Sequence, residues 1–422
     1  MPGYTHALDS RALSASSPTL PHPLRLPDYR RLLIVSGAMQ LAHQMQATAV
    51  GWDLYERTGA VLALAWVGLA QLLPALLLFI PAGELADRHD RRRVMAASLV
   101  LVVLGSAGLA AAAGTGAAVI WTYASLLLTS AAQVVNRPSR DALLPRVVPE
   151  AQLGQAVALN ASVFQSASII GPAAAGLIIA ATQSAVPVFA ADLVLAVVAL
   201  VTALRLRVGG KPPAQAPLTL RALLAGLEHV WRTKVILGAI TLDLFAVLFG
   251  GATALLPVYA KDILHVGPAG LGWLNAAPAI GAVSMALWLT RRPPRARVGR
   301  LFFASVAAFG IATAIFGLST SYSLSFVVLI AIGAFDNVSV VIRQTVVQLW
   351  TPDALRGRVS AVNRVFVSSS NELGAFESGA VAALIGPVAT VVAGGAATVI
   401  VTLAALRLFP ELRRLQTLHQ TS

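Results

Sequence analysis

The sequence predicts an all-α polytopic membrane protein, with twelve transmembrane helices in two six-helix halves that form a parallel repeat. Three observations lead to this prediction: an apolar composition, a series of long apolar runs and an internal repeat. Hydrophobic residues make up 57% of the 422 residues, and charged residues only 12%. The mean hydropathy of +0.76 is higher than a soluble protein of this size needs for its core.

Apolar runs that can cross a bilayer occur twelve times along the chain. A spanning helix needs about 20 mostly apolar residues. The runs are too long and too continuous for the alternating strands of an outer-membrane barrel. The predicted helices cover residues 32–55, 61–82, 94–115, 117–136, 156–181, 186–206, 235–258, 268–290, 301–318, 322–345, 359–385 and 387–408.

These runs divide the chain into two halves. The first half covers residues 32–206 and the second covers 235–408. A tail over 1–31 precedes them, a linker over 207–234 joins them, and a second tail over 409–422 follows. No stretch outside the runs is long enough for a separate catalytic domain.

The linker is predicted to lie along the membrane surface. Four residues that end helices occur early in it: Gly209, Gly210, Pro212 and Pro213. Residues from Leu218 to Arg232 then follow the pattern of an amphipathic helix, with Arg221, Glu228 and Arg232 on the polar side. We therefore expect an interfacial connector here.

Positive charge is concentrated on one side of the predicted membrane. Of the 31 Lys and Arg residues, Arg57 and Lys261 alone fall in loops on one side, and the other 29 lie in the tails, in the opposite loops or at the helix ends next to them. The positive-inside rule therefore predicts that both termini are cytoplasmic, in a plasma membrane. This placement also explains the net charge of +13 without nucleic-acid binding. Residues 1–31 contain no apolar core of a signal peptide.

The composition excludes several kinds of chemistry. The chain has no cysteine, which excludes disulfides, thiol catalysis and thiolate metal sites. The seven histidines show no zinc-binding spacing. No cluster of a nucleophile and a base is visible either. We expect no metal site, no cofactor and no enzymatic activity.

An internal repeat relates the two halves. Residues 140–180 and 343–383 align without gaps at an offset of 203, with ten identities in 41 positions. The identities include Arg140 with Arg343 and Asn160 with Asn363, which the abundance of alanine and glycine does not explain. Because both segments run in the same direction, they predict a parallel repeat about an axis along the membrane normal.

The loop between the second and third predicted helices carries a dense group of charges. It reads Gly83-Glu-Leu-Ala-Asp87-Arg-His-Asp90-Arg-Arg-Arg93. The glycine would let two helices approach closely, and a carboxylate can pair with arginine or with a helix N-terminus. The segment resembles the corresponding loop of the major facilitator superfamily of secondary transporters, although Asp90 stands where that family has glycine. The resemblance implies a gating role for Gly83, Asp87, Arg88, Arg91 and Arg92.

Polar side chains inside predicted spans mark a cavity, because charge at membrane depth is expensive. The helix over 32–55 carries Gln40, His43, Gln44, Gln46 and Asp53. Of these, His43, Gln46 and Asp53 follow one helical stripe, which predicts the wall of a water-filled cavity. Asp53 lies near the outer end, and simple solvation beside Arg57 is the alternative.

Acidic residues occur in four other predicted spans, and three of these spans carry aspartate. The helix over 322–345 carries Asp336, Asn337 and Arg343, of which Asp336 and Arg343 share a face. We expect an ion pair within the bundle to neutralise these two, with a role that is either structural or part of transport. Asp243 and Asp192 have no basic residue nearby on their own helices. Each could pair across helices or take up a proton.

The helix over 359–385 contains Glu372 and Glu377, which align with Ile169 and Ala174 in the first copy of the repeat. Their absence from that copy indicates a role beyond architecture, although a hydrogen bond between helices is the alternative. Their side chains lie ~140° apart around a helix, and we expect Glu377, on a stripe with Asn363, to face water. Desolvation favours the neutral form of a carboxyl group, which suits proton coupling. The predicted order of coupling residues is Glu377, Glu372, Asp336, Asp243 and Asp53; the predicted cavity or substrate residues are Gln40, His43, Gln44, Gln46, Asn337, Arg343, Asn363 and Asn371.

The helix over 156–181 contains Gly171, Pro172 and Gly176, which resemble the antiporter motif of the superfamily. Small residues and proline there would bend the helix and permit close packing. The arginine that many proton antiporters carry inside the fourth helix is missing; Arg137 and Arg140 lie at its end instead.

Within the superfamily, the chain resembles the branch of enterobactin exporters and transmembrane secretion effectors over nearly its whole length. The similarity rests on segments 52–59, 83–93, 136–140, 352–359 and 370–379. The resemblance implies efflux of siderophores, drugs or other amphipathic metabolites, driven by protons. The abundance of Arg and Ala suggests a GC-rich bacterial source.

Two other functions remain open. An importer or lipid flippase would use the same fold, and a membrane sensor that transports nothing is a more distant alternative. The expected partners are the lipid bilayer, a small-molecule substrate and protons, without nucleic acid, and the protein is expected to be a monomer.

Overall fold

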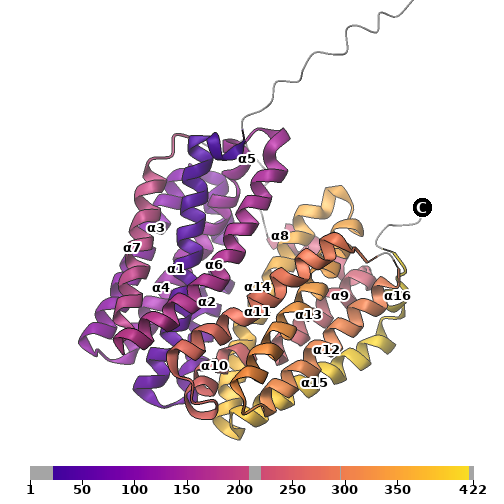
Figure 1. Ribbon diagram of the computed structural model, residues 1–422. Coiled ribbons are helices and arrows are strands. Elements are labelled where there is room, and N and C mark those ends of the chain that lie inside the picture. Colours follow the sequence, from indigo (N-terminus) through magenta and orange to yellow (C-terminus); the bar gives the residue numbers. More distant parts are fainter. Residues whose placement is uncertain (1–21, 209–219, 295, 418–422) are drawn as a thin grey trace, which may run out of the picture.

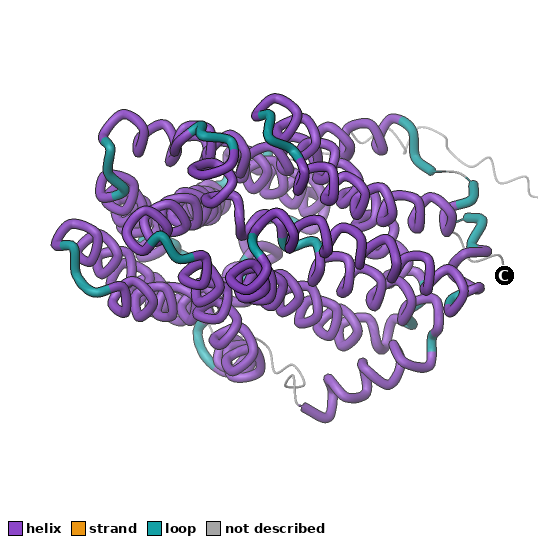
Figure 2. The backbone as a smooth tube through the Cα atoms, turned by 90° about the horizontal axis from the view of Figure 1, so that it is seen from below, coloured by secondary structure: helices purple, strands orange, loops and turns teal. Residues whose placement is uncertain are grey.

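The computed structural model describes residues 22–208, 220–294 and 296–417 (Figure 1). Helices joined by short loops account for nearly all of them, and no strand occurs in these ranges (Figure 2). The all-α prediction is therefore confirmed. The first half consists of η1 (Pro23–Arg25), α1 (Pro27–Thr58), α2 (Val61–Arg88), α3 (Arg91–Thr115), α4 (Val119–Asp141), α5 (Leu144–Val147), η2 (Glu150–Gln152), α6 (Leu153–Thr182) and α7 (Val186–Leu204).

The second half begins after the linker. Its elements are α8 (Leu220–Arg232), α9 (Lys234–Phe249), η3 (Ala252–Leu255), α10 (Leu256–Val258), η4 (Tyr259–Ile263), α11 (Gly267–Arg291), α12 (Val298–Leu318), α13 (Tyr322–Leu349), α14 (Asp353–Ile385), α15 (Pro387–Leu408) and α16 (Pro410–Arg414).

Ten of the described helical segments are long and apolar enough to cross a membrane. Two further helices, α1 with 32 residues and α14 with 33, have the length but carry more polar residues. Together they make the twelve predicted spans. The two polar helices are the ones in which the sequence places most of its cavity residues, and this polarity is the reason for their lower hydropathy.

The seventh span is broken, whereas the sequence predicted one continuous run over 235–258. Helix α9 ends at Phe249, and a short 3-10 turn, α10 and the π-helix η4 follow it. The break begins at Gly250, where an added Cβ would lie 2.5 Å from the Ala246 carbonyl oxygen. Pro257 then removes a backbone donor from the next turn. Hydropathy does not detect such a break because the residues around it, apart from Thr253, are glycine, proline or apolar.

Each half packs around its own apolar core. In the first half, α1 packs against α6 and α7, and α3 packs against α4 and α7. In the second half, α12 packs against α13 and α15, and α11 packs along α13. The buried cores include Leu99 and Phe189 in the first half, and Phe302 and Phe316 in the second.

Two helix pairs join the halves: α2 with α14, and α6 with α11. Both pairs rely on glycine. A Cβ added to Gly68 of α2 would lie 2.7 Å from the Phe376 backbone nitrogen, and one added to Gly176 of α6 would lie 2.4 Å from the Pro268 carbonyl oxygen. The repeated helices α6 and α14 thus each cross the seam to the second span of the other half, as a parallel repeat requires.

The halves converge toward the end that carries α10 and diverge toward the end that carries α5 and α8 (Figure 1). The diverging end holds the loops rich in arginine, and we call it the arginine-rich end; the end with the loops around Gly59, Gly116, Gln183, His265 and Gly386 is the arginine-poor end. The seam contacts of Gly68 and Gly176 both lie in the half of the bundle nearer the arginine-poor end.

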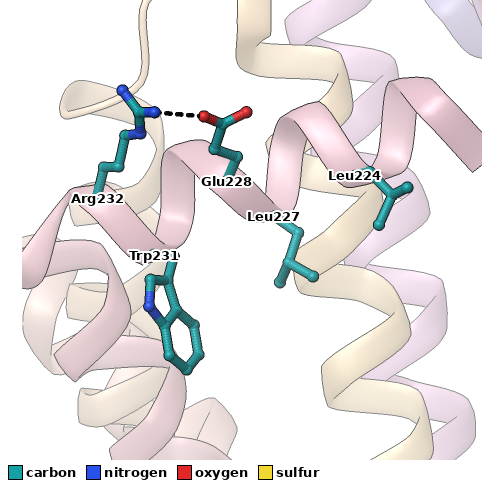
Figure 3. A pocket seen from close by; sticks show the side chains of 5 residues that line it. All are labelled: Leu224, Leu227, Glu228, Trp231 and Arg232. Atoms are coloured by element: carbon teal, nitrogen blue, oxygen red, sulfur yellow. Dashed lines mark ion pairs between the residues drawn. The ribbon is translucent and has the colours of Figure 1, made fainter.

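The amphipathic connector helix is present as α8. The residues predicted to precede it, Gly209, Gly210, Pro212 and Pro213, lie outside the described residues, as do Leu218, the predicted first residue of the helix, and the side chain of Arg221. Glu228 and Arg232 form an ion pair of 2.6 Å on one side of α8, and Trp231 and Leu227 point to the other side (Figure 3). Helix α8 packs against α14, with Gly226 against the backbone of Arg358.

Candidate transport site

A cavity of about 250 Å³ lies on the seam between the two halves. Residues from α1, α2, η3, α10, α11 and α14 line it, so both halves contribute. Its polar residues are Thr48, Gln71, Thr253, Asn275 and Glu372. Gln71 and Asn275 were not among the sequence predictions, because one amide in an apolar span gives no pattern that a single sequence can reveal.

Helix α14 carries a stripe of exposed polar side chains. Arg364, Ser368 and Asn371 follow each other at helical spacing and are exposed, although they lie well inside the span. Glu372 continues this stripe into the seam cavity. Because an exposed arginine at this depth is unfavourable in lipid, the stripe faces the space between the halves.

Glu377, the first-ranked coupling residue from the sequence, is not among the residues that line the seam cavity. Its Oε2 lies 3.4 Å from the Ser378 hydroxyl, which donates to it. Ser370, on the same stripe, is buried. Of the two glutamates, the geometry therefore favours Glu372 as the one that faces a cavity.

A cluster of charged side chains lies inside the second half, where α9, α13 and α14 meet. Arg343 Nε lies 3.1 Å from Asp243 Oδ1, and Arg343 Nη1 donates a hydrogen bond of 2.8 Å to Asn363 Oδ1. Arg343 and Asp243 are both almost fully buried. Arg343 thus pairs with Asp243 rather than with Asp336, and the pair across helices is one of the two roles expected for Asp243. Spacing along one helix shows which residues share a face, but not which neighbouring helix supplies a better partner.

Asp336 lies within electrostatic reach of both Asp243 and Arg343. The cluster therefore contains two carboxyl groups and one guanidinium. Asn337, next to it, has its side-chain Oδ1 buried without a hydrogen bond to the described residues. The sequence placed Asp243, Asp336, Asn337, Arg343 and Asn363 in the site separately, and the structure brings them to one region of the second half.

The first half contains the same framework residues in a different setting. Arg140 Nε lies 3.9 Å from the carboxylate of its neighbour Asp141. Asn160 Oδ1 is buried and accepts no hydrogen bond from the described residues. The first copy of the repeat thus lacks the close Arg–Asn–Asp contacts of the second.

The predicted cavity residues of α1, Gln40, His43, Gln44 and Gln46, are not among the residues that line the seam cavity. Gln46 is buried, and its Nε2 lies 3.5 Å from Thr129 Oγ1 of α4. His43 Nδ1 lies 3.3 Å from Gln133 Nε2 of α4. Gln40 and Gln44 are half-buried. The Gln46 contact holds two helices of the first half together.

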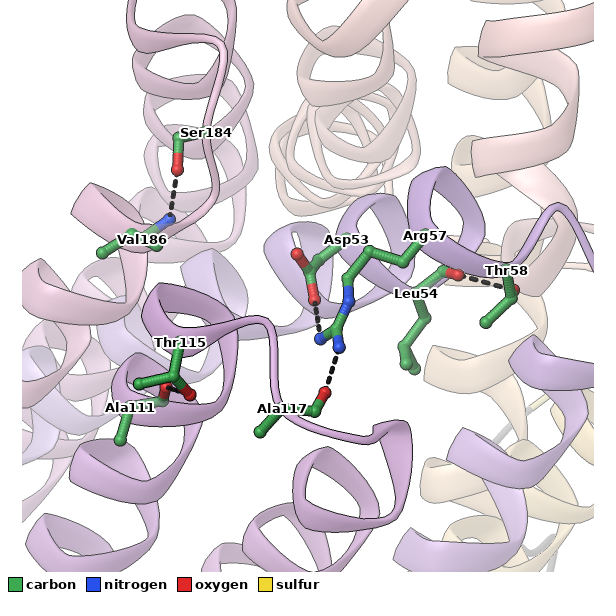
Figure 4. A network of polar contacts seen from close by, with 9 residues as sticks. All are labelled: Asp53, Leu54, Arg57, Thr58, Ala111, Thr115, Ala117, Ser184 and Val186. Carbon is green, nitrogen blue, oxygen red and sulfur yellow. Dashed lines mark hydrogen bonds and ion pairs between the residues drawn. The ribbon is translucent and has the colours of Figure 1, made fainter.

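Asp53 lies at the arginine-poor end of α1, in a local structural network (Figure 4). Its Oδ2 lies 3.4 Å from Arg57 Nη1, and Arg57 also donates to the Ala117 carbonyl oxygen. This network ties α1 to the loop before α4 (Figure 4). These contacts favour the alternative in which Asp53 lies beside Arg57 over a place in the wall of a cavity.

A polar contact that the sequence did not predict joins the halves at the arginine-poor end. Tyr55 donates a hydrogen bond to Asp262 Oδ2, and Lys261 Nζ lies 2.9 Å from Glu56 Oε2. Lys261 also lies 5.7 Å from the centre of the Tyr55 ring. We call these four residues the outer latch. Its partners are about half the chain apart, so no local motif could reveal it, although π-helices such as η4 often mark functional positions.

The loop between α2 and α3 makes ion pairs and arginine hydrogen bonds with its own half. Asp87 Oδ1 lies 3.7 Å from Arg91 Nη2, and Arg88 pairs with Glu84. Arg91 and Arg92 donate to the carbonyl oxygens of Ala142 and Leu204, respectively. Asp90 caps α3 by accepting from the backbone of Arg92. A Cβ added to Gly83 would meet nothing within 4 Å, so the close helix approach expected at this glycine is not made in this conformation.

The Gly-Pro motif of α6 lies at two helix contacts. A Cβ added to Gly171 would lie 2.6 Å from Gln44 Cβ of α1, and Gly176 contacts α11 across the seam. Pro172 lies inside the helix, and its carbonyl oxygen approaches Gly272 of α11. The motif therefore contacts both its own half and the other half.

Asp192 of α7 is buried beside Ser106 of α3, away from the seam cavity. Among the described residues, no group of three or more His, Asp or Glu side chains could hold a metal ion.

Comparisons with known proteins agree with this architecture. A model of the transmembrane secretion effector family matches residues 18–422. The chain is 27% identical over 352 residues to the enterobactin exporter of Shigella boydii, covering 82% of this chain and 84% of that protein. The enterobactin exporter of Escherichia coli gives the same values, 27% over 352 residues.

Solved transporter structures share the fold. The nucleoside transporter NupG superposes with a TM-score of 0.73 at 13% identity, covering 90% of this chain and 100% of that one. A bacterial homologue of the human lysosomal transporter Spinster, in an inward-facing and unoccupied conformation, superposes with a TM-score of 0.68 at 14% identity, covering 92% and 98%. At such identities the similarity shows the fold alone.

Proposed function

This chain belongs to the transmembrane secretion effector family of membrane transporters, and on that premise we propose that it exports a siderophore, drug or other medium-sized organic metabolite by proton-coupled alternating access. The relatives named enterobactin exporters support the choice of export over import. A siderophore is accordingly the first substrate class to test.

The observation that carries the coupling proposal is the charge cluster of the second half. Asp243 is paired with Arg343, whereas Asp336 is within electrostatic reach of both and forms no ion pair among the described residues. A buried cluster with two ionised carboxylates and one cation would hold an uncompensated charge, which costs several kcal/mol. The cluster is therefore expected to hold a proton in one state of the cycle and release it in the other, with Asp336 as its site.

The remaining carboxyl groups fit this role less well. Asp53 is held by Arg57, and Glu377 lies beside Ser378 outside the seam cavity. Glu372 faces the cavity and is the second choice. Asp243 acts in this proposal as the fixed partner of Arg343.

We propose that the arginine-rich end is cytoplasmic, as the charge distribution indicates. The conformation described here then opens toward the cytoplasm and is closed outside by the seam and the outer latch. In the opposite conformation, Gly83 and Asp87 would come close to the other half, so that the loop between α2 and α3 gates the change. A monomer is sufficient for this cycle, because both halves lie in one chain.

Cysteine labelling tests the orientation, because the chain has no cysteine of its own. Single cysteines at Gly116, Gln183, Ser321 and Gly386 should react with an impermeant reagent outside the cell. Cysteines at His89, Gln215 and Thr417 should react only after the membrane is opened. The reverse pattern would refute the proposed orientation.

Everted vesicles test the function. In vesicles acidified inside, the exporter should accumulate a siderophore against its gradient, and an ionophore that collapses the proton gradient should stop this accumulation. Vesicles that lack the protein are the control. Accumulation in right-side-out vesicles instead would indicate an importer, and movement of labelled phospholipid alone would indicate a flippase.

A further inference from the structure

The seam cavity contains one carboxylate without a partner. Glu372 makes no hydrogen bond or ion pair with its side chain among the described residues. Every other lining residue of the cavity is neutral. The cavity of about 250 Å³ is large enough for a small functional group rather than for a whole siderophore or drug.

Three basic side chains are candidate partners for Glu372, because they lie on its helix or at the same end of the bundle. Each of them either pairs with another carboxylate or lies far from Glu372. Lys261 pairs with Glu56, and Arg57 pairs with Asp53. Arg364, on the same helix as Glu372, lies eight residues earlier, which corresponds to about 12 Å along the axis. None of the three compensates the Glu372 carboxylate in this conformation.

The rest of the cavity wall suits an alkylated cation. The side chains of Thr48, Gln71 and Asn275 present oxygen atoms that can face a positive charge. Leu64 and Val67 of α2 supply an apolar wall for the carbon atoms around it. A single fixed carboxylate in a mostly apolar site attracts a cation more strongly than it would in water.

We infer that this cavity is a subsite for an ammonium group of the transported molecule, with Glu372 as its counter-ion. The inference rests on the proposed function and narrows it to substrates that carry a basic or quaternary nitrogen. Because residues of both halves line the cavity, the rearrangement of the halves would take the site apart. Binding and release of the ammonium group would thus follow the conformational cycle.

Glu372 could instead carry a proton without contacting the substrate. Binding of a quaternary ammonium compound distinguishes this role from that of a counter-ion. Choline has a permanent charge and no acidic proton on nitrogen, and dimethylbutanol is its neutral isostere. Titration of the full-length protein in nanodiscs, followed by saturation-transfer NMR, measures both affinities. We expect the parent to bind choline about tenfold or more tightly than the isostere, as a charged contact predicts.

Substitutions at position 372 test whether Glu372 causes the preference for choline over its neutral isostere. Glu372→Gln should reduce choline affinity about tenfold and leave the isostere unchanged. Glu372→Asp keeps the charge and should retain the preference for choline. Glu377→Gln removes the same charge five residues away and should bind as the parent does. Thermal unfolding of each variant identifies loss of folding.

Equal affinity of the parent for choline and its isostere, including no measurable binding of either, would overturn the inference. So would a folded Glu372→Gln protein that keeps the preference. The assay needs neither a proton gradient nor transport. If choline binding behaves as expected while vesicles show no export, the proposed function fails and the cation subsite remains.

Discussion

The two copies of the internal repeat share framework residues and differ in charge. Both carry an arginine at the end of the first helix and an asparagine in the second, Arg140 with Asn160 and Arg343 with Asn363. In the second copy these two residues contact each other and Asp243. In the first copy, Asn160 Oδ1 is buried without a partner among the described residues.

The difference extends to the acids. Seven residues before the repeated arginine, the first copy has Gln133 and the second has Asp336. At a later aligned position, the first copy has Ile169 and the second has Glu372. A helix of the same architecture thus forms without these carboxylates. The comparison teaches that the repeat builds the scaffold twice and that the second half alone carries the buried acid cluster.

The largest expected difference concerns the two arginines. Arg343→Ala leaves the Asp243 carboxylate buried without a cation, which should lower the free energy of unfolding by about 3–5 kcal/mol. Arg140→Ala breaks only a 3.9 Å contact with the more exposed Asp141, and should cost no more than about 1 kcal/mol. Thermal and chemical unfolding in detergent would compare the two.

Neutralising the partner provides the control for this prediction. Asp243→Asn in the Arg343→Ala background should recover part of the lost stability, because the uncompensated charge is gone. Equal destabilisation by Arg140→Ala and Arg343→Ala would contradict the predicted difference between the two copies of the repeat.

A smaller difference is expected for the asparagines. Asn363→Ala removes the 2.8 Å hydrogen bond to Arg343, and hydrogen bonds to charged groups contribute about 1.5–3 kcal/mol. Asn160→Ala removes a buried oxygen that has no hydrogen bond, so its effect on the free energy of unfolding should be smaller. A greater loss from Asn160→Ala would show that the first copy forms equivalent contacts in solution.

The seam glycines should show no asymmetry, because both copies use them alike. Gly176→Val and Gly379→Val each push a side chain into backbone of the other half, with Cβ contacts of 2.4 Å to Pro268 and 2.8 Å to Ala65. Each should destabilise the closed seam by about 1–3 kcal/mol. A cysteine at Gln71, in the seam cavity, should then react faster with reagent from the arginine-poor side.

An aligned pair of glycines serves as the control. Added Cβ atoms at Gly154 and Gly357 would meet nothing within 4 Å, so their alanine variants should leave this labelling rate unchanged. A clear effect of Gly176→Val without one of Gly379→Val would mean that the two seam contacts are not equivalent.

The fold followed from the sequence because hydropathy and the repeat are averages over many residues. The spans in α1 and α14 were also predicted, although their polar residues lower their mean hydropathy, because both runs are long and have charged residues at their ends. The break at Gly250 escaped prediction, because the backbone can bend there without any change in hydropathy. Contacts with Phe309 and Ala246 around Gly250 become visible only when the helices are packed.

The sequence predicted which residues belong to the site, but not which of them contact each other. The sequence selected Asp243, Asp336 and Arg343 and allowed for a pair of Asp243 across helices, but it did not identify Arg343 as the partner of Asp243. The outer latch was missed for the same reason, since Tyr55 and Asp262 are far apart in the chain. Which side chains meet across helices depends on the rotation of each helix about its own axis, which one sequence does not determine.

The most direct test is transport against a gradient by the Asp336→Asn variant in everted vesicles. Glu377→Gln is the control, because it also removes one carboxylate but lies outside the acid cluster. We expect Asp336→Asn to lose accumulation against a gradient while substrate counterflow, which needs no net proton movement, continues. Glu377→Gln should accumulate substrate as the parent does. Full uphill transport by Asp336→Asn, or its loss in Glu377→Gln alone, would contradict coupling by the acid cluster of the second half.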